Sequence, residues 1–316
     1  MTSPWPKLSL VIPCGPKDDD HLKTFLASLD QQDYPKDRLE VLCIREGNSE
    51  EAKAIGIAQA SGEVIGMFCT DNVLIGSEFL RTMVKATDGV TGAYTSHYHY
   101  EPTDTVLSRY FALLGANDPL CWWLGKADRQ SWLRGYPKGQ TNHEVDFAYH
   151  AYLPSLGDNG FFLHAALAKS VLTTPSEFGS CMDMCERLKQ AGQATYRIVG
   201  TTVWHRSGLS WRRYFVKRWR YVRDLYWARL STRRWVMVQS LRDWMGVCGF
   251  GICSLLVLPH LVISLRGYRR VRDMAWFLHP IVCVVLTGVY ACAWADHLLR
   301  RLLSSRRGTV PTRTPD

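Results

Sequence analysis

Asp71 follows a short apolar stretch, a placement typical of residues that bind a ligand. The segment 63–68 is predicted to be a buried strand, and Thr70, Asp71 and Asn72 follow it with a hydroxyl, a carboxylate and an amide. Ligands of open α/β sheets bind at the carboxyl ends of the strands. Carboxylate oxygen is also a ligand that Mg²⁺ and Mn²⁺ prefer. We therefore predict a metal ion at Asp71, with a plain Asp-Asn turn as the alternative.

The elements that would position Asp71 alternate between strands and helices. Apolar segments at 8–13 and 39–44 predict two further strands, and 22–29 and 50–60 carry helical patterns. Strands that alternate with helices through short polar turns imply right-handed βαβ units and a mostly parallel sheet. The fold class is therefore predicted to be α/β.

The stretch 115–129 is denser in aromatic, amide and charged residues than a plain connection needs. It contains Asn117 and Asp118 in a Gly-Ala-Asn-Asp-Pro sequence. We predict that these two residues belong to a sugar- or acceptor-binding surface. An aromatic-rich subdomain packed under the sheet is an equally good interpretation.

The order of motifs in roughly the first quarter of the chain resembles the nucleotide-binding half of family-2 glycosyltransferases with the GT-A fold. Strand-Pro at 8–13, Tyr34-Pro35, the turn 46–49 and the Gly-Glu before 64–68 occur in the same order as in that family. The resemblance implies an inverting hexosyl transfer from a nucleotide sugar. It also implies a divalent metal cofactor, Mn²⁺ or Mg²⁺, because the departing diphosphate gains negative charge.

The resemblance also implies which residues bind the nucleotide. Pro13 and Glu46 would lie beside the nucleoside, and Lys53 beside the diphosphate. Asp71 matches the second Asp of the Asp-x-Asp metal motif. Cys69 replaces the first Asp, and a thiol is a poor ligand for a hard cation.

Later positions match the family less closely. Asp158 and Asn159 stand in a Gly-rich turn that would line the donor sugar, although an Asx turn is an alternative. Asp183 is the candidate general base, with a helix N-terminal Asp as the structural alternative. A phosphate acceptor would need no base of that kind. His205, after the last predicted strand, would complete the metal site, with a structural histidine as the alternative.

The C-terminal part has a different composition. The 316-residue chain carries a formal charge of +9, and cations crowd the region after Arg206 among Trp and Tyr. Segments 245–265 and 274–295 are uncharged and long enough to span a bilayer. We predict a catalytic domain at 1–208 (nucleotide half 1–88, acceptor half 89–208), interfacial helices at 209–244, two membrane helices at 245–298 and a disordered basic tail at 299–316.

This organisation predicts an enzyme on the cytoplasmic face of a membrane, the inner membrane in a bacterium. Its partners would be a nucleotide sugar, a lipid-linked acceptor (a polyprenyl phosphate or a glycolipid) and anionic phospholipid, and not nucleic acid. Two spans are preferred over a re-entrant hairpin, and a homo-oligomer is left open. Ten scattered cysteines and the absence of a signal peptide fit a reduced compartment. The alternatives are a processive polysaccharide synthase and a catalytically degenerate membrane scaffold that binds a nucleotide diphosphate.

Overall fold

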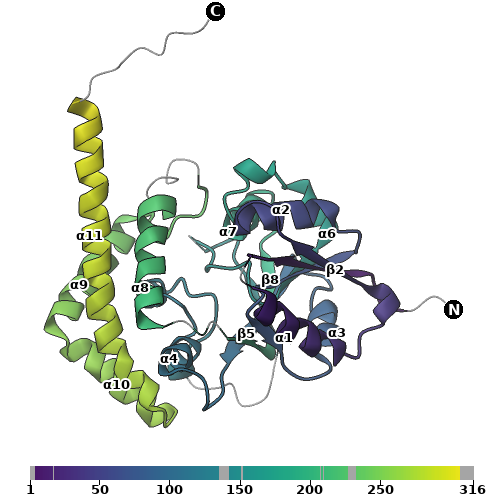
Figure 1. Ribbon diagram of the computed structural model, residues 1–316, viewed down its shortest axis with the longest axis horizontal. Helices are drawn as coiled ribbons and strands as arrows, with labels where there is room; N and C mark the ends of the chain where they lie inside the picture. Colours follow the sequence, from purple (N-terminus) through teal and green to yellow (C-terminus); the bar gives the residue numbers. More distant parts are fainter. Residues whose placement is uncertain are drawn as a thin grey trace, which may run out of the picture.

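The computed structural model describes residues 4–16, 18–134, 142–150, 152–206, 208, 210–226 and 233–306. A sheet covered by helices forms one part, and a group of helices near the C-terminus forms the other (Figure 1). The long helix α11 (Leu278–Arg306) stands at the edge of the molecule opposite β2 (Leu39–Ile44). Helices α4 (Val106–Leu114) and α8 (Trp211–Arg220) lie between α11 and the sheet.

The nucleotide half has the predicted strand–helix alternation. Strands β1 (Leu8–Pro13), β2 (Leu39–Ile44) and β3 (Val64–Met67) are mutually parallel, with β1 in the centre. Helices α1 (Asp19–Asp30) and α2 (Ser49–Gln59) connect them. Helix α2 begins with a capping box, in which Asn48 accepts from the backbone and Glu51 reaches back to Asn48.

The whole sheet is mixed, with the order β2-β1-β3-β7-β5-β8-β4. β5 (Gly92–His99) runs parallel to β8 (Thr195–His205). β7 (Phe161–His164) is antiparallel to both β3 and β5, so it joins the two parallel halves. β4 (Asn72–Leu74) and β6 (His143–Asp146) pair antiparallel with β8. The predicted α/β class is confirmed, and the parallel pairs lie within the two halves.

Helices α3 (Phe79–Lys85), α4 (Val106–Leu114), α6 (Ala165–Ser170) and α7 (Cys181–Gln190) lie around the sheet. The short helix α5 (Pro119–Trp123) packs instead against helices of the C-terminal part. Two large apolar clusters fill the faces of the sheet. One centres on Phe161 and Tyr196, and the other on Phe25, Phe68 and Phe162. These fully buried side chains hold the strands, and the strand ends carry the polar residues of the site.

The C-terminal helices begin with α8 (Trp211–Arg220), which continues as a π-helix over Tyr221–Tyr226. α9 (Leu241–Leu256) and α10 (Leu258–Arg270) meet at 88° at Val257, whose φ of 61° cannot continue a right-handed helix. A 3₁₀ turn (Met274–Phe277) leads into α11 (Leu278–Arg306).

Within the described residues one helix, Met274–Arg300, is long and apolar enough to cross a membrane. The bent pair α9–α10 passes the same test only as a broken span or a re-entrant loop. The two apolar segments of the sequence therefore differ: one is a continuous helix and the other is sharply bent two residues before Pro259.

The segment expected to form interfacial helices is only partly helical. Residues 233–240 form no helix, although the sequence indicated a helical pattern as far as Trp244. Several of its aromatic and cationic side chains also point into the protein. Tyr214 and Trp235 are buried, and the guanidinium of Arg218 forms hydrogen bonds within the fold. These side chains are therefore not free to lie in lipid headgroups.

Among the described residues, three ion pairs attach the C-terminal helices to the sheet part. Lys126 Nζ lies 2.9 Å from Asp243 Oδ2, and Arg109 Nε lies 3.0 Å from Asp273 Oδ2. Arg218 pairs with Asp118 at 3.4 Å. The side chain of Lys126 is fully buried, so the attachment at α9 is an internal ion pair rather than a surface contact.

Candidate active site

Asp71 and His205 lie side by side because of the pairing between β4 and β8. Asn72 is opposite His205 in that antiparallel ladder, and the Arg206 N–H donates to the Asp71 carbonyl at 2.7 Å. The imidazole Nε2 of His205 lies 3.1 Å from Asp71 Oδ2. The other carboxylate oxygen, Asp71 Oδ1, is buried and has no hydrogen-bond partner among the described residues.

The charges around Asp71 favour its ionised form. Burial alone would raise the pKa of the Asp71 carboxyl, but the charge and hydrogen bond of His205, with help from Lys217, lower it below its usual value. Burial opposes the charged form of His205, yet Asp71 outweighs this and raises the pKa of His205. The result is a carboxylate with one unpartnered oxygen, which is able to bind a cation.

The turn that carries Asp71 is fixed by Asn72. Its side-chain Oδ1 accepts from the Cys69 N–H at 3.0 Å, and its Nδ2 donates to Asn159 Oδ1 at 3.0 Å. Burial and the nearby carboxylates of Asp158 and Asp71 raise the pKa of the Cys69 thiol. A protonated thiol does not replace the missing family carboxylate as a ligand for a hard cation.

Asp158 and Asn159 lie in a turn that packs tightly against α7. Gly157 has a φ of 124°, and a Cβ there would lie 2.1 Å from the Cβ of Cys181, so only glycine fits. Asn159 also has positive φ. The Arg129 guanidinium donates to the carbonyls of Asp158, at 3.1 Å, and Asn159, at 2.7 Å, which fixes the turn.

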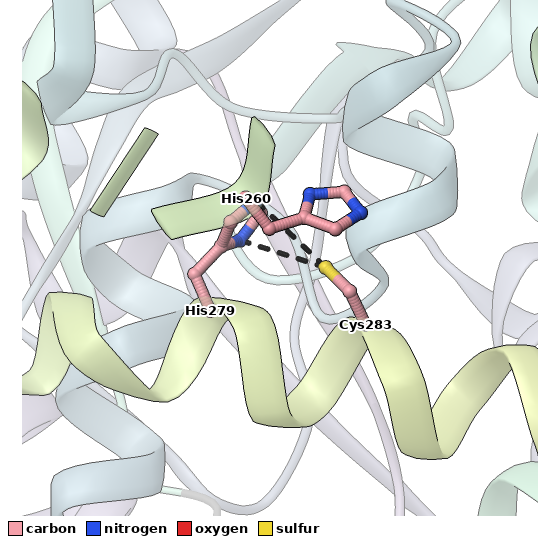
Figure 2. Close-up of side chains that lie close together, drawn as sticks. All are labelled: His260, His279 and Cys283. Atoms are coloured by element: carbon pink, nitrogen blue, oxygen red, sulfur yellow. Dashed lines mark hydrogen bonds between the residues drawn. The ribbon is translucent and has the colours of Figure 1, made fainter. Parts of the chain in front are cut away.

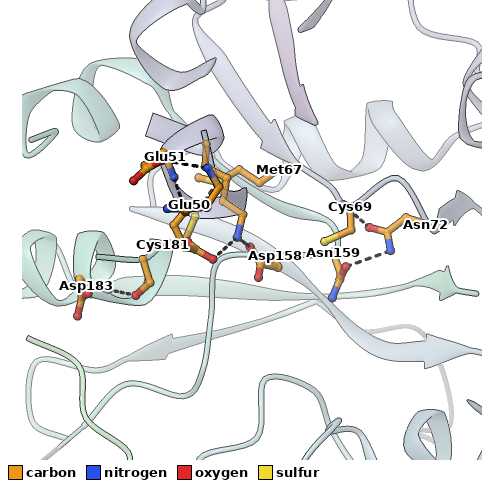
Figure 3. Close-up of polar contacts among 12 residues, drawn as sticks. Glu50, Glu51, Met67, Cys69, Asn72, Asp158, Asn159, Cys181 and Asp183 are labelled. Atoms are coloured by element: carbon orange, nitrogen blue, oxygen red, sulfur yellow. Dashed lines mark hydrogen bonds and ion pairs between the residues drawn. The ribbon is translucent and has the colours of Figure 1, made fainter. Parts of the chain in front are cut away.

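Lys53 is an internal cation paired with two carboxylates. Its Nζ lies 2.6 Å from Asp158 Oδ1 and 2.9 Å from Glu50 Oε1, and its side chain is 3% exposed. Figure 3 shows the two carboxylates, Glu50 and Asp158, close to each other, and Asn159 turned toward Asn72. Burial raises the pKa of Glu50. The sequence placed Lys53 beside a diphosphate, whereas here its contacts position the Asp158 turn.

Asp183 lies in the first turn of α7 and holds the chain that leads to α9. Its Oδ1 accepts from the backbone N–H groups of Arg234, at 2.9 Å, and Trp235, at 2.7 Å. Its Oδ2 is buried without a hydrogen-bond partner in the described part of the chain. Gly179 leaves room for this oxygen, since a Cβ there would lie 2.1 Å from it.

Asn117 and Asp118 contact the C-terminal helices. The Asn117 carbonyl accepts from the Tyr214 hydroxyl at 2.8 Å and from Arg218 at 2.7 Å. Asp118 Oδ2 accepts from the Tyr290 hydroxyl at 2.5 Å and pairs with Arg218. Sequence reasoning did not identify Arg218 and Tyr290 as part of this group, because each occurs in a segment whose composition suggested contact with membrane.

Pro13 and Glu46 lie on neighbouring parallel strands. Pro13 ends β1 opposite Ile44, and the Cys14 N–H donates to the Ile44 carbonyl at 2.8 Å. Glu46 is exposed in the turn after β2, before Gly47 with a φ of 72°. The two predicted nucleoside contacts thus lie at the same edge of the sheet.

A cavity of about 570 Å³ separates the sheet from the C-terminal helices. One side, the polar wall, consists of Tyr98, Asp128, Asp158 and Asn159; the opposite side, the apolar wall, consists of Trp244, Val247, Phe250 and Trp294. Arg218, Asn117 and Asp118 also line the cavity. The sequence had suggested no individual role for Asp128. Its Oδ2 accepts from the Tyr98 hydroxyl at 2.5 Å, and burial raises its pKa.

Comparison with known proteins identifies the fold. No protein-family model and no curated protein sequence matches the chain. A mannosyltransferase, PcManGT from Pyrobaculum calidifontis, solved in complex with GDP-Man and Mn²⁺, superposes with a TM-score of 0.52 over 93% of this chain and 87% of that one. The fold is GT-A-like. At 12% sequence identity, this likeness concerns the fold alone.

Structures of S. aureus TarS 1–349 are similar at a lower level. The free form and the complex with UDP-GlcNAc each give a TM-score of 0.40 at 12% identity, over 92% of both chains. The GT-A-like architecture predicted from the motif order is thereby confirmed by the mannosyltransferase, independently of any sequence match.

Proposed function

We propose that the chain is an inverting, metal-dependent glycosyltransferase that moves a sugar from a nucleotide sugar to a lipid-linked acceptor. The observation that carries this proposal is the ionised Asp71 with its unpartnered Oδ1, beside His205 in a GT-A-like fold. The solved neighbour with this fold holds GDP-Man and Mn²⁺. Nucleotide binding without turnover is the outcome against which the proposal is tested below.

Asp71 and His205 fit a divalent cation because they offer a carboxylate oxygen and an imidazole nitrogen at the end of neighbouring strands. Such a cation, Mn²⁺ or Mg²⁺, would stabilise the negative charge that develops on the departing nucleotide diphosphate. His205 must give up its proton to act as a ligand, and its hydrogen bond to Asp71 would then be replaced. Lys217, whose charge reaches Asp71, adds positive charge from α8.

Four further residues would contact the donor. Pro13 and Glu46 would bind the nucleoside at the edge of β1 and β2. Asp158 and Asn159 would contact the sugar from the polar wall, and Lys53 would act by holding Asp158 in place. Because the Lys53 ammonium is already paired with two carboxylates, we assign it to positioning the donor rather than to neutralising the diphosphate.

The apolar wall supports a lipid-linked acceptor. Trp244 and Trp294 face the cavity from α9 and α11, and α11 is the helix long and apolar enough to enter a membrane. An acyl or prenyl chain could thus lie along α9 while its polar head meets the polar wall. Arg218 also lines the cavity, where its guanidinium is already paired with Asp118, so we assign it to holding the 117–118 segment rather than to binding the head group. In this proposal the catalytic domain works on the cytoplasmic face of the membrane, against anionic phospholipid.

Asp183 remains our candidate base for an acceptor with a free hydroxyl. Its Oδ1 is occupied by two backbone N–H groups, which leaves Oδ2 to accept a proton. An ionised phosphate acceptor would not need this proton transfer. The Asp183→Asn variant keeps an oxygen for the two N–H groups, so a loss confined to hydroxyl acceptors would support the base.

The decisive variant is Asp71→Asn, assayed with the full chain in detergent or vesicles. We expect Mn²⁺-dependent transfer from a UDP or GDP sugar to a polyprenyl phosphate or glycolipid to fall about 10²–10³-fold. Asp88→Asn, at an exposed turn, is the matched control and should retain full activity. Near-normal transfer by Asp71→Asn would refute the proposal. Binding of a nucleotide diphosphate by the wild type without turnover on any acceptor would favour a binding protein.

A further inference from the structure

Three metal-ligating side chains meet in the helical part, away from Asp71. His260 comes from α10, and His279 and Cys283 lie one turn apart on α11. One ligand atom from each residue lies within 4.8 Å of the others, and all three side chains are fully buried. Figure 2 shows His279 and Cys283 projecting from α11 toward His260. Such a group of ionisable side chains among apolar helices is costly unless it has a ligand or a function.

The hydrogen bonds of Ser254 determine which nitrogen of His260 is available. The Ser254 hydroxyl donates its proton to the Phe250 carbonyl at 2.8 Å, so its oxygen can only accept from His260 Nε2, 3.1 Å away. His260 Nε2 therefore carries the hydrogen, and Nδ1 has a free lone pair. Nδ1 is buried and has no hydrogen-bond partner among the described residues.

His279 is oriented by a similar outer contact. Its Nδ1 lies 2.7 Å from the Tyr110 hydroxyl, and its Nε2 lies 3.7 Å from the Cys283 sulfur. The sulfur also lies 3.8 Å from Nδ1. If Nδ1–H is donated to the Tyr110 oxygen, Nε2 is the ring nitrogen that keeps a lone pair for a metal. Metal-binding histidines commonly donate their second ring N–H to an oxygen in this way, which fixes the ring and raises its basicity.

We propose that His260, His279 and Cys283 bind one zinc ion. Two imidazole nitrogens and a thiolate form a soft ligand set that suits zinc, in contrast to the hard oxygen at Asp71. On binding, the Cys283 thiol releases its proton to solvent and the sulfur forms a bond to the metal. The fourth tetrahedral position is left for water or another ligand.

The location indicates a structural role. The ring centroids of His260 and His279 lie 5.0 Å apart, and Trp123 packs against His260 at 5.7 Å. Phe250, in the apolar wall, packs against His260 at 5.3 Å. A bound ion would therefore tie the bent pair α9–α10 to α11 directly behind the apolar wall of the cavity.

The test measures metal content and not activity. The full chain is purified in detergent without chelator, equilibrated with Zn²⁺, desalted and analysed by mass spectrometry for metals. We expect about one zinc ion per chain in the wild type and its loss in Cys283→Ser and His260→Asn. Cys292→Ser removes an exposed cysteine from the same helix and should keep the zinc.

Cobalt substitution gives a second measurement. It is made on the wild type, so a folding defect in a variant does not affect it. Wild-type protein loaded with Co²⁺ should show a thiolate-to-cobalt charge-transfer band in the near ultraviolet, and Cys292→Ser should show the same band. The absence of both the band and stoichiometric zinc in the wild type would overturn the proposal. Retention of zinc by Cys283→Ser, or binding of Cu⁺ in place of Zn²⁺, would also overturn it.

This inference is independent of the proposed function. The zinc measurement is repeated with Asp71→Asn, which should retain the zinc because Asp71 belongs to the other site. Loss of the zinc in that variant would place the ion at Asp71 and refute the helical site. Loss of transfer with zinc retained would concern the proposed function only.

Discussion

The two walls of the cavity differ in how their side chains are held. On the polar wall, Asp158 pairs with Lys53 of α2, Asn159 accepts from Asn72 of β4, and Asp128 accepts from the Tyr98 hydroxyl of β5. On the apolar wall, Trp244 and Trp294 are about half exposed, at 49% each. The first wall is rigid and polar, as a small hydrophilic donor requires. The second offers apolar area that a lipid can cover.

The difference suggests a division of roles between the walls. Polar groups must be placed to within a fraction of an ångström to orient a reacting sugar, and here the turn that carries Asp158 and Asn159 is braced by Arg129. Apolar contact with a lipid chain is non-directional and tolerates motion. Variants of one wall should therefore change turnover, and variants of the other should change acceptor binding.

The largest expected effect on stability comes from breaking the buried ion pair that attaches α9, which carries part of the apolar wall, to the sheet part. Lys126 Nζ is bonded to Asp243 Oδ2 at 2.9 Å and to the Met237 carbonyl at 2.7 Å in the interior. Asp243→Asn leaves the buried ammonium without its counter-ion, so we expect unfolding free energy to fall by about 3–5 kcal/mol, measured by urea denaturation.

Two controls sharpen that prediction. Lys126→Met combined with Asp243→Asn removes both charges and should lose less than the single variant. Arg300→Met breaks an exposed pair with Asp296 and should cost at most about 0.5 kcal/mol. Equal losses in Asp243→Asn and Arg300→Met would contradict an internal attachment of the apolar wall.

An intermediate effect is expected on acceptor binding. Trp244→Ala removes a large, partly exposed side chain from the apolar wall, so KM for the lipid acceptor should rise about tenfold because apolar contact is lost. Donor hydrolysis in the absence of acceptor should not change. Trp211→Ala removes an exposed tryptophan of α8 outside the cavity and serves as the control. If Trp244→Ala raised the KM for the donor and not the KM for the acceptor, the assignment of the apolar wall to acceptor binding would be wrong.

The smallest effect is a pH-dependent contribution of the Asp71–His205 pair in chelated, metal-free protein. The raised pKa of His205 makes its contribution present at low pH and lost as pH rises through that pKa. The lowered pKa of Asp71 makes its contribution present above the usual Asp range and lost as pH falls through the lowered value.

The stability difference between wild type and His205→Asn should therefore be greatest at mildly acidic to neutral pH, at about 1 kcal/mol, and shrink on either side. Urea unfolding across pH measures this difference. If this difference in unfolding free energy instead grew steadily toward alkaline pH, His205 would not be paired with Asp71 as a cation.

Part of the candidate site could be predicted from the sequence because its residues stand at or just after the ends of predicted strands. Asp71 and His205 were proposed on this ground, and the register of β4 with β8 brings them side by side. The braces were not predictable. Lys53 and Arg129 hold the Asp158 turn through contacts between distant segments, which periodicity and turn signals do not encode.

The helical side was harder to predict because its composition is ambiguous. Arg and Tyr suit lipid headgroups, yet Tyr214 and Arg218, four residues apart on one face of α8, both bond to the Asn117 carbonyl inside the protein. The bend at Val257 could not be predicted from the sequence either. Pro259 suggested a kink, but the sequence does not specify a positive φ at a β-branched residue.

The most direct test of the central claim is a thermal-shift measurement of nucleotide diphosphates with and without Mn²⁺. A ligand that binds only the folded chain, present at about 100 times its Kd, stabilises it by about 2.7 kcal/mol. We predict that UDP or GDP raises the Tm of the wild type and of Asp88→Asn only when Mn²⁺ is present, and that Asp71→Asn shows no such rise. An equal, Mn²⁺-dependent rise in Asp71→Asn would contradict the account.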